Sequence, residues 1–144
     1  MADIIPHDAM RAMAAAEIAV GSHTFKAALF TSSATVNADN VGLSDLGANQ
    51  VANGNGYTTG GATVTATVTD SDGSDNVKFD ISDPSWTASG GSVGPFRYLV
   101  VYDDTHASDQ IVYIVDLGTN ITITSGGSWS LTVDANGLFT MAQA

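Results

Sequence analysis

The chain has 144 residues, contains no cysteine and carries a formal net charge of −11. Its length is that of one ordinary domain with a single core, and the lack of thiols excludes disulfide bonds, thiolate metal sites and cysteine nucleophiles. The scattered basic residues and the lack of a bilayer-length apolar run argue against nucleic-acid and membrane partners. These basic residues are Arg11, Lys26, Lys78 and Arg97.

Residues 8–19 form the only stretch with strong helix propensity. Asp8 is a plausible N-cap, alanine dominates the segment, and Gly21 follows as a stop signal. We therefore predict that residues 1–22 form a helical arm, which either folds onto its own domain or docks on a neighbour. The candidate interface residues on the apolar stripe of this helix are Met10, Met13 and Ile18, although Glu17 interrupts the stripe.

From His23 onward the hydrophobic pattern has a period of two, which is typical of β-strands. Residues 23–31 are predicted as a first strand. Residues 61–69, "GATVTATVT", alternate small apolar residues with threonine and are predicted as one strand, and residues 76–81 as its hairpin partner. The side chains expected on the buried face of the 61–69 strand are Ala62, Val64, Ala66 and Val68.

Two later segments, 95–103 and 110–118, are apolar on both faces, as central strands are when a sheet is covered on both sides. The polar loop between them predicts a second hairpin. The tail adds alternating pieces around Ile121, Trp129 and a short segment after the Asn136-Gly137 turn. The whole pattern predicts an all-β fold of about eight strands. We expect residues 23–144 to form one β-sandwich or jelly-roll-like domain.

The glycine-rich segment before residue 62 superficially resembles a phosphate-binding loop. Its glycines do not fit the G-x-G-x-x-G spacing, because Thr59 stands where the third glycine is needed. A strand rather than a helix follows, so no helix N-terminus is available to hold an anion. We interpret this segment as a structural lead-in to a strand. We expect no cofactor.

Acidic residues and histidines give only weak chemical signals. Asp70, Asp72 and Asp75 lie within six residues and are a weak Ca²⁺ candidate, but the spacing does not fit an EF-hand loop. The histidines His7, His23 and His106 share no metal-ligand spacing, and no G-x-S-x-G motif is present. A solvated acidic turn explains the aspartates more simply. We therefore predict no catalytic residues and a protein that is not an enzyme.

Aromatic residues leave one further possibility open. A glycan-binding β-sandwich would expose rings as a platform for sugars, and the chain has Trp86 and Trp129 in strand-like segments. Tyr98, Tyr102 and Tyr113 belong to the most apolar strands, however, which favours burial.

The order of several segments carries a resemblance. An N-terminal helix, "FKAALFT", "GYTTGGATVT", "DPSWTA", "FRYLVVYDD", "IVYIVDLG" and a closing "NGLFTM" follow one another. Together they resemble a family of small structural proteins of tailed-bacteriophage virions. The residues that match the family pattern, all of them interpreted as scaffold, are Lys26, Leu29, Tyr57, Gly60, Gly61, Trp86, Arg97, Tyr102, Asp116 and Gly118.

The resemblance implies a virion component without catalytic residues. A capsid decoration, or cement, protein on the outside of the shell is the leading hypothesis, because such a protein needs only one compact β domain and an arm. Its implied partners are the major capsid protein and further copies of itself, with a homotrimer expected from closed symmetry. A tail or fibre-associated module and a glycan-binding sandwich remain as alternatives.

Overall fold

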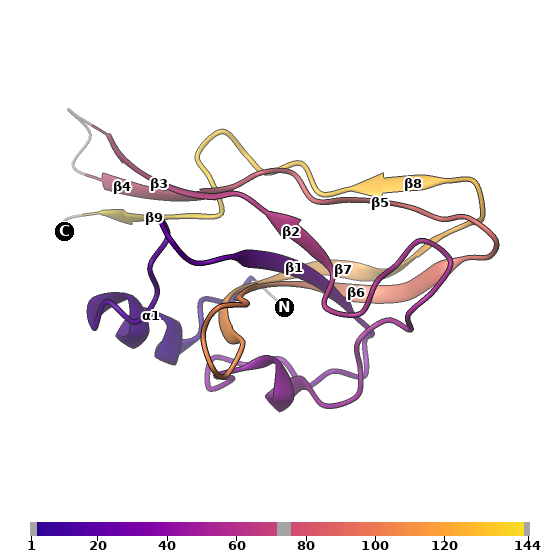
Figure 1. Ribbon diagram of the computed structural model, residues 1–144, viewed down its shortest axis with the longest axis horizontal. Helices are drawn as coiled ribbons and strands as arrows, with labels where there is room; N and C mark the ends of the chain where they lie inside the picture. The colour runs from indigo at the N-terminus through magenta and orange to yellow at the C-terminus, as the bar shows by residue number, and fades with distance from the viewer. Residues whose placement is uncertain (1–2, 72–75, 143–144) are drawn as a thin grey trace.

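The computed structural model describes residues 3–71 and 76–142 of the chain (Figure 1). It contains one α-helix and one short 3₁₀ helix among strands arranged in antiparallel sheets, so the predicted all-β class is confirmed. In chain order the elements are α1 (His7–Ala14), β1 (Phe25–Phe30), η1 (Leu43–Leu46), β2 (Ala62–Val64), β3 (Ala66–Ser71), β4 (Asn76–Ile81), β5 (Ser85–Thr87), β6 (Val93–Asp103), β7 (Gln110–Ile123), β8 (Ser128–Ser130) and β9 (Phe139–Ala142).

A four-stranded sheet in the order β2-β1-β6-β7 forms the middle of the molecule. The segments predicted as central strands are β6 and β7, which pair as the predicted hairpin, with Leu99 opposite Val115. Most of the apolar side chains of β6 are buried, whichever face of the sheet they lie on. β7 continues as far as Ile123 and so includes the alternating piece around Ile121.

Both faces of this sheet are covered, as its apolar strands require. On one face lie the sheets β3-β4-β9 and β5-β8 (Figure 1), and the core between the layers includes Leu29, Phe79 and Trp86. On the opposite face, the segment that contains η1 contributes Leu46 to a second cluster with Phe30. The N-terminal helix α1 lies at one end of the molecule.

The segment 61–69 differs from the prediction of one strand. It is divided at Thr65, so that β2 pairs with β1 while β3 pairs with β4 in a different sheet. At the crossing, the Thr65 N–H donates to the Ser82 hydroxyl (3.0 Å) and its carbonyl accepts from the Ser82 N–H (2.9 Å). The predicted burial of Val68 is wrong, because β3 extends beyond the core and leaves this side chain 49% exposed.

The helix also differs from the prediction. It ends at Ala14, and Ala16 adopts a left-handed φ of 58°. The Glu17 N–H then donates to the Ala12 carbonyl and the Ala16 N–H to the Met13 carbonyl, which is the hydrogen-bond pattern of a Schellman motif. The predicted stop at Gly21 is therefore wrong.

The N-terminal segment lies against its own domain. Ile4 forms a β-bridge with Ile114 of β7, and the helix residues Ala9 and Ala12 are fully buried. The predicted N-cap, Asp8, instead lies in the first turn, where its carboxylate accepts from the Arg11 guanidinium at 2.6 Å. The helical turn thus packs through its alanines and holds its charged side chains outward.

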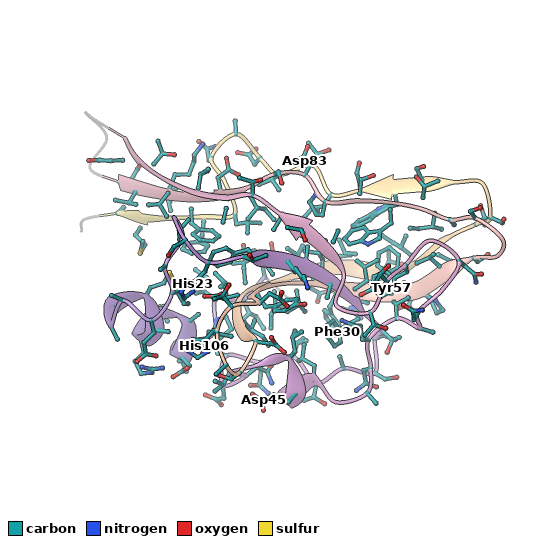
Figure 2. The ribbon with its side chains drawn as sticks, in the orientation of Figure 1. His23, Phe30, Asp45, Tyr57, Asp83 and His106 are labelled. Atoms are coloured by element: carbon teal, nitrogen blue, oxygen red, sulfur yellow. The ribbon has the colours of Figure 1, made fainter. Side chains whose placement is uncertain are left out.

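The glycine-rich segment packs tightly against the central sheet (Figure 2). The Tyr57 hydroxyl accepts from the Leu29 N–H at 3.0 Å, and the Tyr102 hydroxyl donates to the Gly60 carbonyl at 2.8 Å. Gly61 has φ +82°, and a Cβ at this position would overlap the carbonyl oxygen of Ala27. Only glycine lets the backbone approach β1 this closely while turning into β2.

Candidate functional site

The candidate site is an apolar groove between α1 and the C-terminal strand β9. Its volume is about 340 Å³. Its lining residues, which come from the two ends of the described chain, are Ile5, Met10, Met13, Ala14, Phe139 and Met141. We call this surface the methionine groove. No charged residue is among the lining side chains, so the surface is suited to apolar contact rather than to chemistry.

Helix α1 supplies one wall because of its residue spacing. Met10, Met13 and Ala14 are separated by three and four positions and therefore lie on one side of the helix. The buried Ala9 and Ala12 attach the helix to the domain from another side. Small side chains at the packing surface bring the helix close to the sheet and leave the longer methionines available at its rim.

β9 supplies the other wall and is held by an aromatic stack. The Phe139 ring lies between Phe79, at a centroid distance of 5.0 Å, and Tyr113, at 5.7 Å, with both pairs nearly parallel. The strand register places Val77 opposite Met141, on the same face as the Phe79–Phe139 pair. Met141 therefore belongs to the inner face of its sheet, yet it is 48% exposed because nothing in the described residues covers it.

Exposed apolar side chains are concentrated at this end of the domain. Among the described residues, the large hydrophobic side chains classed as exposed are Met10, Val41, Val68 and Met141. Met10 and Met141 line the groove, and Val68 lies opposite Phe79 on the same face of the sheet as Met141. Val41 lies apart from the groove, next to Gln110. Clustered exposure of this kind is typical of an interaction surface.

The structure separates the predicted interface residues. Met10 and Met13 line the groove, whereas Ile18 lies beyond the end of the helix and is only 7% exposed, in the main core. Phe139 and Met141 are not among the interface residues predicted from the sequence. Their alternation after the Asn136-Gly137 turn indicated a strand, but no local signal indicated that this strand would lie opposite the helix.

The weak Ca²⁺ candidate is not brought together within the described structure. Asp70 is exposed on β3, and Asp72 and Asp75 lie outside the described residues. In the parts of the chain that the structure describes, no group of three or more His, Cys, Asp or Glu side chains is placed to hold a metal ion.

Two of the three histidines contact the same carboxylate, and the third lies beside a different one. His23 Nδ1 lies 2.5 Å from a carboxylate oxygen of Asp103, which is fully buried and also accepts from the Thr105 and His106 N–H groups. This pair joins the start of β1 to the β6–β7 hairpin, near which Figure 2 also places His106. His7 is exposed and lies 3.3 Å from a carboxylate oxygen of Asp39.

The aromatic residues form core rather than an exposed platform. Trp86, Tyr98 and Tyr102 are all at most 5% exposed. Trp86 stacks on Trp129 at a centroid distance of 5.9 Å, and Phe96 meets Trp129 edge to face at 5.1 Å. These contacts explain the aromatic content of the strands by packing between β5, β6 and β8.

A second cavity of about 260 Å³ is lined in part by Asp3, Tyr113 and Asp134. Asp3 accepts from the Asp116 N–H at 2.9 Å and from the Tyr113 hydroxyl at 3.3 Å. Burial, together with the nearby Asp3 carboxylate, raises the pKa of Tyr113 to about 12. Since Asp3 is already engaged by β7, this cavity is explained by attachment of the N-terminal segment.

No protein-family model, curated protein or solved structure gave a significant match. Across residues 3–71 and 76–142, no helix has both the length and the apolar character needed to cross a membrane.

Proposed function

We propose that this chain is a structural protein of a tailed-bacteriophage virion: a decoration protein that binds the outer surface of the major capsid protein shell and stabilises it. The observation that carries the proposal is the open methionine groove on a small, acidic all-β domain. The order of the sequence segments, which resembles that of small virion proteins, supports the phage context. In this proposal the layered sheets are a β-sandwich of jelly-roll type and serve as the scaffold for the binding surface.

The groove supports binding because the exposure of its apolar side chains to water is unfavourable, and a bound partner would remove that exposure. Met10 and Met141 are each about half exposed. Completing the burial of one such side chain contributes on the order of 1 kcal/mol, about half the value for burying a whole methionine. Methionine is also flexible and adapts to irregular partner surfaces. One groove alone gives a modest contact, which suits a protein that acts in many copies.

The proposed mechanism is stabilisation by mass action. A protein that binds only the assembled shell raises the free energy of shell disassembly in proportion to the number of bound copies. A homotrimer that assembles on the shell at threefold positions, and not from free copies in solution, would bring three grooves to neighbouring capsid subunits at once, and linked contacts bind far more tightly than single ones. The large negative charge would keep unbound copies apart and soluble.

The test uses purified shells that lack this protein. Wild-type chain is expected to bind them in hundreds of copies per particle and to raise the temperature at which they release DNA. The double variant Met10→Gln/Met141→Gln should bind poorly, because it keeps side-chain length but adds polar groups to the groove. Val41→Thr is the matched control, since Val41 is exposed but lies outside the groove lining.

Two results would overturn the proposal. One is a complete lack of shell binding by the wild-type chain at saturating concentration. The other is a copy number of a few per particle with density at the tail, which would assign the chain to a tail or fibre-associated module instead.

A further inference from the structure

The strand β9 has an open edge beside the methionine groove. In its sheet the order is β3-β4-β9, so β9 is a terminal strand. Within the described part of the chain, residues 139–142 pair only with β4. Thr140, Met141 and Ala142 are also exposed. An unpaired edge next to an apolar groove is the geometry that extended peptides use when they add a strand to a sheet.

The positive side chains of the domain are all paired within the chain, whereas its negative side chains are in excess. All four lysine and arginine side chains are held by carboxylates of the same chain, with nitrogen-to-oxygen distances of 2.6 to 3.3 Å. The pairs are Arg11 with Asp8 and Glu17, Lys26 with Asp104, Lys78 with Asp80, and Arg97 with Asp116. The net charge of −11 is the excess of 15 aspartate and glutamate side chains over 4 lysine and arginine side chains.

Some of this negative charge lies at the groove end of the molecule. Asp70 is exposed near the end of β3, in the same sheet as β9 and opposite Val77. Lys78 of β4 is engaged twice, by the Asp80 carboxylate at 3.3 Å and by the Ala135 carbonyl at 3.0 Å. A partner that enters here meets an apolar floor, an unpaired strand edge and a negative surrounding potential.

We propose that the occupant of the methionine groove is an extended, apolar segment of the partner protein with lysine or arginine at its flanks. The segment pairs with the open edge of β9 and places alternate side chains against Met10, Met13 and Met141. Its basic flanks face a domain on which carboxylates outnumber lysine and arginine side chains. The identity of the partner as a shell protein rests on the proposed function, whereas the chemistry of the segment rests on the groove, the edge and the charges.

The same charges argue against a second copy as the occupant. Two identical chains would each bring a charge of −11 to the contact. Every lysine and arginine side chain in each copy is already bound to a carboxylate of its own chain. Like charges placed across an interface disfavour association. A basic partner is attracted by the same field and gains a faster encounter.

The test uses a short synthetic peptide in which valine and threonine alternate between flanking lysine pairs. Binding to the full chain is measured by fluorescence anisotropy, and its location by NMR shifts of backbone amides. We expect the peptide to shift the amides of β9 and to bind at least about tenfold more tightly than its glutamate-flanked counterpart. This difference should shrink when the salt rises from about 0.1 M to about 1 M, where charges are screened within roughly 3 Å.

Two controls separate the parts of the proposal. Met10→Gln/Met141→Gln should weaken peptide binding about tenfold or more, whereas Val41→Thr should leave it unchanged. A peptide in which every amide of the valine and threonine segment is N-methylated has no N–H to donate along either edge and should also lose binding. Retention of the wild-type melting temperature shows that each variant is folded.

The proposal is overturned if lysine-flanked and glutamate-flanked peptides bind equally, if N-methylation has no effect, or if β9 amides do not shift. It is also overturned if the chain self-associates through the groove, seen as a concentration-dependent dimer that Met10→Gln/Met141→Gln abolishes. If peptide binding fails while the same double variant still loses shell binding, the partner chemistry is wrong and the proposed function stands. If shells are not bound at all, the proposed function fails whatever the peptides do.

Discussion

The rings of Phe79 and Phe139 lie parallel, with planes 7° apart and centroids 5.0 Å apart. This contact joins a strand from the middle of the chain to the last described strand, and it places Met141 two residues further along the same face. Phe25 adds an edge-to-face contact to Phe79 at 6.2 Å. The sheet wall of the groove therefore depends on aromatic packing as well as on the short β4–β9 ladder.

Phe139→Ala is expected to release β9 from the domain. Phe139 is half-buried, so its truncation should cost about 2 kcal/mol of unfolding free energy, less than the 3–5 kcal/mol typical of a fully buried phenylalanine. Urea denaturation measures this loss, and limited proteolysis should show earlier cleavage near the C-terminal strand. Met141→Gln is the control, because it changes the exposed neighbour and should leave the midpoint nearly unchanged.

Gly61→Ala and Gly118→Ala form a matched pair. Both glycines have positive φ, +82° and +74°, but a Cβ at Gly118 meets no atom within 4 Å, whereas one at Gly61 overlaps the backbone of Ala27. Gly118→Ala should therefore cost about 1 kcal/mol for conformation alone. Gly61→Ala should cost about 3 kcal/mol beyond that, because β2 must move away from β1. Equal melting temperatures for the two variants would contradict the close approach.

Ala16→Gly is expected to stabilise the chain. Ala16 ends the helix in a left-handed conformation with φ 58°, which glycine adopts without the steric cost of a Cβ. A gain of about 1 kcal/mol should appear as a higher midpoint in urea. Ala15→Gly, one residue earlier at a φ of −83°, is the control and should not stabilise. A loss of stability in Ala16→Gly would show that the helix does not end at this residue.

Asp116 gives the fold a defined sensitivity to acid. Its hydrogen bonds to the Arg97 guanidinium, at 2.9 and 3.1 Å, are the main cause that lowers the pKa of Asp116 to about 2 from an ordinary value of 3.8. A depressed folded-state pKa stabilises the fold above the unfolded-state pKa, and this contribution is lost as the pH falls from about 4 towards 2. Asp116→Asn should lower stability at pH 7 and flatten the pH dependence in that window. An unchanged slope would contradict the assignment.

Tyr57 should make the fold sensitive to alkali. Burial raises its pKa to about 12, so the protonated phenol stabilises the fold below its ordinary pKa of 10, and this contribution is lost as the pH rises from 10 to 12. Tyr57→Phe removes this titration, and it also leaves the buried Leu29 N–H without its acceptor, at a cost of about 1–3 kcal/mol. Denaturation curves at pH 8 and above pH 10 measure both effects. Thr58→Val, at an exposed neighbour, is the control.

The hydrophobic pattern of short segments predicted several strands correctly. Residues 76–81 form β4 as predicted, and 95–103 and 110–118 form the central hairpin, because their alternation or double-sided apolarity has one solution. The prediction of a single strand over residues 61–69 was wrong, because the chain passes from one sheet to the other at Thr65. The regular alternation is compatible with either sheet, and the point of division depends on where each sheet ends. The predicted end of the helix was wrong because Ala16, and not a glycine, adopts the left-handed conformation that follows the helix.

The candidate site could be predicted only by half. Met10 and Met13 were recognised from helical spacing, which is a local signal. Phe139 and Met141 required knowledge that the last strand joins β4 and faces the first helix, and such long-range pairing leaves no trace in a short window of sequence. The burial of Ile18 could not be predicted from helical spacing either, because the chain leaves the helix at Ala16 and then enters the core.

The two walls of the methionine groove come from residues 5–14 and 139–141, so the surface is completed by the final part of the described chain. The two walls lie far apart in the sequence and meet only when β9 has paired with β4 in the folded domain. The groove therefore exists only in the tertiary fold. A chain in which β9 is displaced keeps the helix wall and loses the strand wall.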